Sequence, residues 1–183
     1  MIIAISVTFL SVGNFSSGFV YVLIFLAIGG SVGAFIAYKI PMTAMPELVA
    51  GFHSLVGLAA VFVAISAFIN PEAFNLGTPG NIKLASLIEM AIGAAVGAIT
   101  FSGSVIAFLK LQGVMSGSPI TFKGQHLLNA LMLISILVFT YYLCSTQSSN
   151  LFWILVATSF LIGFLIIIPI GGADMPVVIS MLN

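Results

Sequence analysis

Long apolar segments separated by short turn-forming segments constrain the fold of this chain more than any other feature. Five of them are close to the roughly 20 residues that a helix needs to cross the hydrocarbon core of a bilayer: 19–38, 48–69, 84–109, 127–144 and 151–168. Charged residues make up only 4% of the 183 residues, whereas a soluble domain carries about 25%. The sequence therefore predicts an all-α fold, a polytopic transmembrane helix bundle.

The two ends of the chain carry further apolar segments. Residues 1–12 are apolar but shorter, and a new apolar run begins at Met175 and stops at Asn183. No lysine or arginine precedes segment 1–12 and no small-x-small cleavage site follows it, so we interpret it as part of a transmembrane helix rather than a signal peptide. We expect about six spans plus the start of another, in a single, partial transmembrane domain covering 1–183.

The composition also argues against several classes of function. Four lysines, no arginine and zero net charge provide no surface for phosphate groups, so nucleic acid is not an expected partner. One cysteine, two histidines and four carboxylates show no metal-ligand spacing. No GxGxxG follows a strand, so no dinucleotide site of the Rossmann type is expected. We assign no catalytic, cofactor-binding or metal-binding residue to this chain.

Two ionisable residues lie inside predicted spans. His53 is about six residues into segment 48–69, and Glu89 is about six into segment 84–109. A charge at such depth costs several kcal/mol unless it is paired or faces water, so each is a candidate functional residue. The structural alternative for His53 is a neutral imidazole that hydrogen-bonds between helices, and Glu89 could still lie in the membrane interface.

Helical periodicity relates these residues to others. At 3.6 residues per turn, one stripe of the fourth expected helix climbs roughly 22 Å along Glu89, Gly93, Val96, Thr100 and Ser104. A polar file with one imidazole, which changes charge near neutral pH, suits proton conduction. Ion channels and solute carriers could use the same residues.

Loop residues have mainly structural interpretations. Pro46 and Glu47 are typical of a helix start, because proline fixes φ and the carboxylate favours the positive end of the helix dipole. Asp174, after two glycines, resembles an N-cap. His126 is expected to meet solvent.

The lysines indicate an orientation. Lys39, Lys110 and Lys123 fall on one side of the predicted topology and Lys83 on the other, so the first side is expected to be cytoplasmic. Lys110 and Lys123 are interpreted as interfacial anchors.

Three groups of motifs resemble the membrane part of the beta subunit of proton-translocating nicotinamide nucleotide transhydrogenase. They are MPELVA at 45–50 with HSLVGLAA at 53–60, GAITFSGSV at 97–105 with KLQG at 110–113, and GGADMPVV at 171–178 with SMLN at 180–183. Together they extend in order over nearly the whole sequence.

The resemblance implies coupling of proton passage through the membrane helices to hydride transfer between NAD(H) and NADP(H) in soluble domains. His53 would be the proton-path histidine, Ser104 the channel serine and Glu89 the intramembrane glutamate. Asn183 would belong to the same pathway, and Asp174 would couple to the NADP(H)-binding domain. His53, Glu89 and Ser104 are also singled out by the residues alone.

The resemblance also implies partners and a location. The partners would be the remaining transhydrogenase membrane helices, soluble NAD(H)- and NADP(H)-binding domains and a lipid bilayer, in a dimer of the complete enzyme. The location would be a bacterial inner membrane. The family's NADP(H)-binding domain has no counterpart in 1–183, so this fragment should bind no cofactor and be inactive alone, although NAD and NADP serve the complete enzyme.

Two alternatives from other classes stay open. One is a secondary carrier or pore for a small solute or ion without redox coupling, which usually has internal repeats; the two halves of this chain show no clear self-similarity. The other is a purely structural fragment.

Overall fold

The computed structural model describes residues 18–177 and divides the chain into two compact units, Met1–Met42 and Thr43–Asn183. In the first unit, helix α2 (Gly18–Lys39) is apolar on all its described faces. At its end, Lys39 Nζ lies 4.6 Å from the centroid of the Phe35 ring, a cation–π contact.

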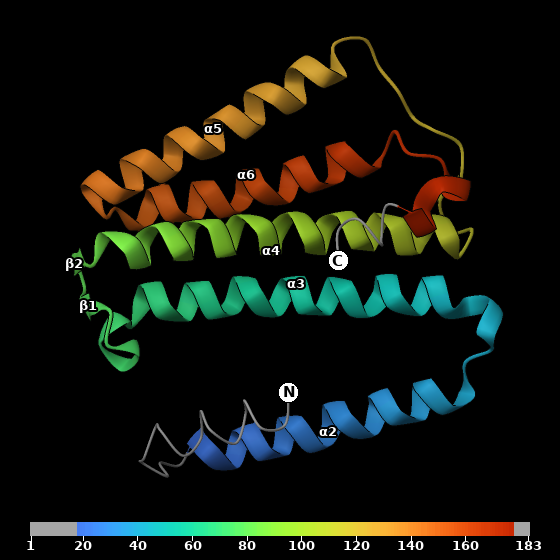
Figure 1. Ribbon diagram of the computed structural model, residues 1–183, viewed down its shortest axis with the longest axis horizontal. Helices are drawn as coiled ribbons and strands as arrows, with labels where there is room; N and C mark the ends of the chain where they lie inside the picture. Colours follow the sequence, from blue (N-terminus) through green and yellow to red (C-terminus); the bar gives the residue numbers. More distant parts are fainter. Residues whose placement is uncertain (1–17, 178–183) are drawn as a thin grey trace. The chain divides into compact units, whose positions relative to one another are not determined.

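The second unit is a layer of four long helices, α3 (Met45–Ile69), α4 (Leu84–Leu111), α5 (Gln125–Thr146) and α6 (Ser149–Ile167). Helix α4 packs against α3 on one side and α6 on the other, and α5 packs mainly on α6 (Figure 1). Short 3₁₀ turns η1 (Met42–Ala44), η2 (Pro71–Phe74) and η3 (Gly172–Asp174) lie beside the helix ends.

The predicted all-α class and the five long apolar segments are confirmed. Each segment coincides with one of the helices α2 to α6, and all five are long and apolar enough to cross a membrane. Segment 1–12 and the end of the run that begins at Met175 lie outside the described residues. The prediction of a single domain therefore stays a prediction.

Small side chains form the centre of the four-helix layer. The buried face of α4 consists largely of alanine, glycine and serine, which let helix backbones approach closely where lipid supplies no hydrophobic driving force between helices. Larger residues fill the space beside them, including Phe152 of α6, whose ring stacks on Phe68 of α3 with centroids 4.4 Å apart. Packing of this kind fixes the relative positions of α3, α4 and α6.

A small β-hairpin between α3 and α4 was not predicted from the sequence. Its strands, β1 (Gly77–Thr78) and β2 (Asn81–Ile82), pair in antiparallel register around Pro79 and Gly80. Proline followed by a glycine with positive φ, here +83°, is the pattern of a type II turn. Gln147, after α5, accepts a hydrogen bond from the N–H of Ile82 (2.9 Å) and donates one to its carbonyl (3.1 Å). The Gln147 side chain thus makes with Ile82 the pair of hydrogen bonds that a third strand would make.

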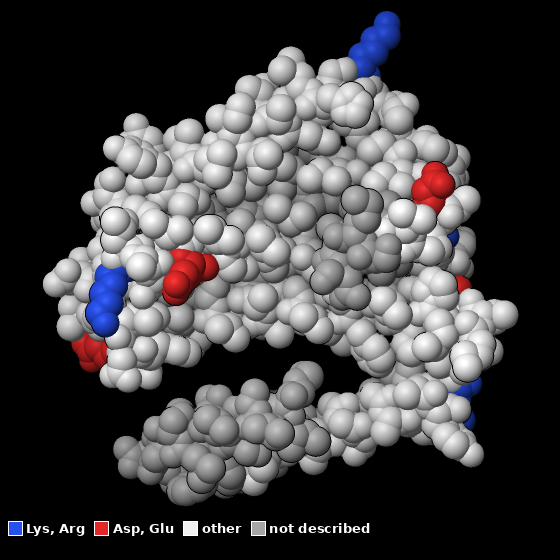
Figure 2. Space-filling view, in the orientation of Figure 1, with Lys and Arg blue, Asp and Glu red and all other residues white. Residues whose placement is uncertain are grey.

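Charged side chains gather towards the two ends of the helices on the face drawn in Figure 2, and the surface between them is almost free of charge. At one end α3 begins with Pro46 in its first turn and Glu47 after it, as predicted. The end of α4 and η3 lie at the same end of the unit (Figure 1).

Candidate functional site

Helices α3 and α4 touch backbone to backbone at two facing glycines. A Cβ atom built on Gly57 would lie 2.7 Å from the carbonyl oxygen of Gly97 and 2.7 Å from the amide nitrogen of Phe101. A Cβ built on Gly97 would lie 2.7 Å from the carbonyl oxygen of Gly57. Because no real side chain tolerates such distances, only glycine fits at this crossing, which we call the glycine contact.

The glycine contact sets the level of His53 along α4. It lies at residues 97–101 of α4. A second contact is nearer the start of α3, where a Cβ built on Gly51 would lie 3.7 Å from the ring of Phe108. Since the two helices are antiparallel, a position between these two contacts on α3 lies opposite a position between them on α4. His53 therefore falls at the level of Ser104.

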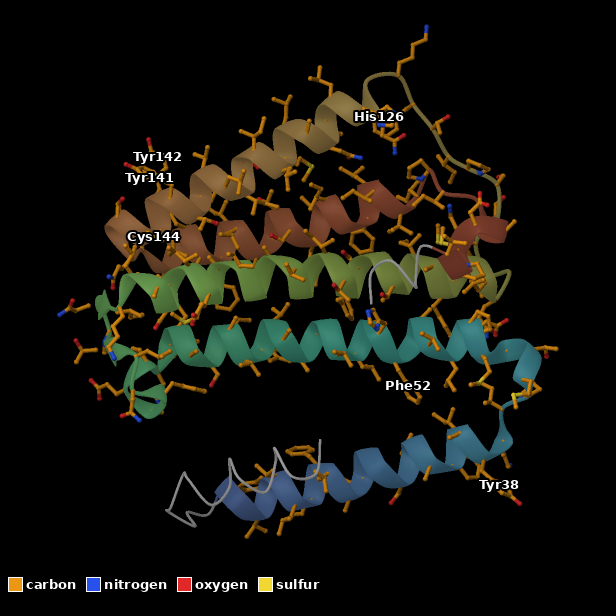
Figure 3. The ribbon with its side chains drawn as sticks, viewed as in Figure 1. Tyr38, Phe52, His126, Tyr141, Tyr142 and Cys144 are labelled. Atoms are coloured by element: carbon orange, nitrogen blue, oxygen red, sulfur yellow. The ribbon has the colours of Figure 1, made fainter. Side chains whose placement is uncertain are left out.

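The orientation of His53 follows from the same contact. Position 53 is one turn from Gly57, so the two differ by only about 40° around the helix, and the His53 side chain is half-buried. Phe52 is exposed and projects from the side of α3 away from α4 (Figure 3). Ser104 is 1% exposed. His53 and Ser104 thus occupy the α3–α4 side of the unit.

Glu89 lies elsewhere along α4. It is exposed and lines a groove of about 360 Å³ between α3 and α4, together with Ala64, Ser86 and Met90 among others. Fifteen residues separate it from Ser104, which corresponds to roughly 22 Å of helix. The structure therefore brings His53 and Ser104 to one level and leaves Glu89 near the opposite end of the unit.

Asp174 lies at the end of the unit where α3 begins. It is exposed, closes the 3₁₀ turn η3 and directly precedes helical residues 175–177. The next residue, Met175, is completely buried and belongs to one apolar cluster with Ala50, Ile106, Ala107 and Ile167. Asn183, the remaining predicted pathway residue, lies outside the described residues.

The apolar cluster connects this end to His53. Ala50 is three residues before His53 on α3, and Ile106 is two residues after Ser104 on α4. Met175, the neighbour of Asp174, is therefore buried within about one helical turn of the level of His53 and Ser104.

The interpretation of Lys110 as an interfacial anchor is wrong. Its side chain is 4% exposed, and Nζ donates hydrogen bonds to the carbonyl oxygens of Ile168 (2.5 Å) and Ile170 (2.7 Å) just after α6. The physical reason is periodicity: Gly103, Ala107 and Lys110 share the buried face of α4. That spacing in the sequence indicated a buried position. It was overlooked because a lysine near the end of a span is usually interpreted as an interfacial anchor.

Two further polar contacts stand at the same end. Gln112, after α4, donates a hydrogen bond to Glu47 at the start of α3. Gln125, 5% exposed at the start of α5, donates to the carbonyl of Leu165 in α6 (3.1 Å). His126 beside it is exposed (Figure 3), and its contact with solvent stays a prediction. No group of three or more His, Cys, Asp or Glu side chains suited to a metal occurs among residues 18–177.

The fold and the site define a multi-pass helical membrane protein in which ionisable and hydroxyl groups lie where two tightly packed helices meet. The family model of the NAD(P) transhydrogenase beta subunit matches residues 1–183. NAD(P) transhydrogenase subunit beta of Rhodospirillum rubrum is 54% identical over 183 residues, which are 100% of this chain and 39% of that protein. The same subunit from strain ATCC 11170 of this species gives the same values.

The chain belongs to the NAD(P) transhydrogenase beta subunit family. It spans about two fifths of the length of the curated relatives that it matches.

Proposed function

We propose that this chain is the proton-translocating membrane part of a nicotinamide nucleotide transhydrogenase. Proton passage through its helices is coupled to hydride transfer between NAD(H) and NADP(H), which soluble domains of the complete assembly bind. The observation that carries the proposal is the position of His53: it lies level with Ser104 at the α3–α4 contact and about one turn from the cluster that buries Met175, the neighbour of Asp174.

His53 is the group that takes up the proton. Neutral imidazole becomes a cation near neutral pH, and a half-buried cation between helices is stabilised only by water or by polar groups such as the Ser104 hydroxyl. Protonation therefore favours a different arrangement of α3 against α4. Glu89, about 22 Å along α4 from Ser104, and Asn183 complete the pathway in this proposal.

The membrane potential supplies the driving energy. Moving one charge through the field is worth about 2.3 kcal/mol per 100 mV. Two states that differ in the side from which His53 receives its proton are thereby shifted tens-fold in population. This shift is transmitted through Ala50 and the Met175 cluster to Asp174, which faces the NADP(H)-binding domain.

The remaining parts of the assembly follow from this role. We infer that the partners are further transhydrogenase membrane helices and the NAD(H)- and NADP(H)-binding domains, in a dimeric enzyme of a bacterial inner membrane. The bacterial source of the relatives supports this location. Residues 1–183 expressed alone are expected to catalyse no hydride transfer.

Replacement of His53 tests the proposal. In the complete assembly reconstituted into vesicles, His53→Ala should abolish proton-coupled turnover, measured as vesicle acidification during NADP(H)-dependent hydride transfer. The matched control is His126→Ala, because this second histidine is exposed at the start of α5; it should pump normally. Normal acidification by His53→Ala would refute the proposed role.

A further inference from the structure

A buried lysine joins α4 to the segment that follows α6. Lys110 lies in the last turn of α4, and its Nζ donates to the carbonyl oxygens of Ile168 and Ile170 at 2.5 and 2.7 Å. Ile168 is the C-cap of α6. The last carbonyls of a helix have no partner within it and carry the negative end of its dipole, so a cation is well placed there. No salt bridge to Lys110 is seen in the described part of the chain.

The same segment is also held by the loop between α4 and α5. The N–H of Gly172 donates to the carbonyl of Gly117 (2.8 Å), and the N–H of Ile120 donates to the carbonyl of Ile168 (3.4 Å). A Cβ built on Gly172 would lie 3.3 Å from Gly117 Cα, so the two backbones nearly touch. The turn 168–172 is therefore fixed between Lys110 and the loop.

The turn 168–172 positions η3 and the helical residues after it. Pro169 lacks an N–H and the glycines at 171 and 172 add little stiffness, so the segment has few bonds of its own. Asp174 ends η3, and Met175 is buried with Ile106 and Ala107, which precede Lys110 on α4. Lys110 thus fixes the end of α6 to the same helix that carries Ser104.

We propose that Lys110 is a positioning residue of the coupling reaction: its two hydrogen bonds transmit movements of α4 to the turn 168–172 and so to Asp174. This inference rests on the proposed function. Without the lysine, only the packing of Met175 and its apolar neighbours connects α4 to the turn, so proton uptake at the level of Ser104 changes the position of Asp174 less.

The first test is Lys110→Met in the complete assembly in vesicles, with Lys123→Met as the matched control because Lys123 is exposed in the following loop. Methionine keeps an unbranched side chain but donates no hydrogen bond. Steady-state proton-coupled turnover should fall about tenfold, the size expected when hydrogen bonds from a charged donor are lost. Single-turnover hydride transfer between bound nucleotides should be unchanged, and Lys110→Arg, which retains charge and donors, should recover most of the coupled rate.

A second measurement does not depend on proton coupling. Ala173 is exposed on η3, and in the complete assembly the rate at which a water-soluble maleimide labels Ala173→Cys, followed on the peptide that contains this position, reports how firmly the turn is held. Lys110→Met should raise this rate about tenfold, again the effect of losing charge-assisted bonds. Should Lys110→Met fail to reach the membrane, Lys110→Gln, which keeps an amide donor, should show smaller changes of the same sign.

The outcomes separate the two proposals. Unchanged labelling, unchanged coupled turnover or a Lys110→Arg variant as defective as Lys110→Met would each overturn the role of Lys110, even where His53→Ala abolishes pumping. Normal pumping by His53→Ala together with increased labelling in Lys110→Met would refute the proton pathway and leave the contact between α4 and the turn intact.

Discussion

Single residues decide how closely the helices of this unit approach. Gly57 and Gly97 face each other with room for hydrogen atoms only, and a Cβ on either would fall 2.7 Å from a backbone atom of the other helix. The level of His53 relative to Ser104 depends on this contact. Small residues one turn apart were visible in the sequence, but the pairing of these two glycines was not, because spacing within one helix does not reveal the register between two.

Replacing Gly57 tests the importance of this contact. Gly57→Ala should force α3 and α4 apart and lower the free energy of unfolding by about 1–3 kcal/mol, the usual effect of overpacking. Gly93→Ala is the matched control, since a Cβ there meets no atom within 4 Å. Thermal unfolding of the two variants in detergent measures the difference. Equal stability of both would show that the helices can separate at no cost.

The candidate site was only partly predictable at the level of residues. His53 and Ser104 stood out because ionisable and hydroxyl groups are rare in apolar spans, and the structure places them at one level. Glu89 stood out for the same reason but lies about 22 Å along the helix from Ser104. Lys110 was misinterpreted although its spacing indicated burial, because its hydrogen-bond partners lie 58 and 60 positions away in the sequence. No local pattern contains such a partner.

At the scale of elements, the helices were predictable and the hairpin was not. A span is recognised from the length of its apolar run, which fixed all five described helices to within a few residues. Strands of two residues contain too few positions to show alternation, and β1 and β2 depend on Gln147, which is 65 residues from Ile82 in the sequence. The hairpin is therefore a product of tertiary contacts.

Shortening Gln147 should loosen the hairpin. Gln147 has a φ of 49°; asparagine tolerates this left-handed conformation but is one methylene too short to reach Ile82. Loss of the two hydrogen bonds should lower the local opening free energy by about 1–2 kcal/mol, so the Ile82 amide should exchange with deuterium roughly tenfold faster. Ser145→Ala, which removes a bond to the Tyr141 carbonyl within α5, should leave that exchange unchanged. Equal exchange in Gln147→Asn would contradict the account.

At the scale of the whole molecule, the two ends of the Thr43–Asn183 unit differ in chemistry. One end carries Lys110, the Gln112–Glu47 hydrogen bond, Asp174 and the buried Met175 cluster. The other end carries the hairpin and, about one and a half turns into α4, Glu89. The coupling proposed for this chain needs such an asymmetry, because the two aqueous sides must act on different parts of the protein.

Coupling between proton binding at His53 and nucleotide binding would have to be reciprocal. If proton binding at His53 changes the affinity for NADP(H), then NADP(H) binding must change proton binding at His53 by the same coupling free energy. The number of protons taken up or released on binding is therefore a direct measure of the linkage. Calorimetry of the complete assembly in buffers with different ionisation enthalpies gives this number.

NADP(H) binding should change the protonation of the wild-type assembly and of His126→Ala by the same amount, because His126 is exposed and lies outside the proposed pathway. The change should disappear in His53→Ala. A His53→Ala assembly that binds NADP(H) with the wild-type number of protons would contradict the central claim that this half-buried imidazole connects proton passage to nucleotide binding.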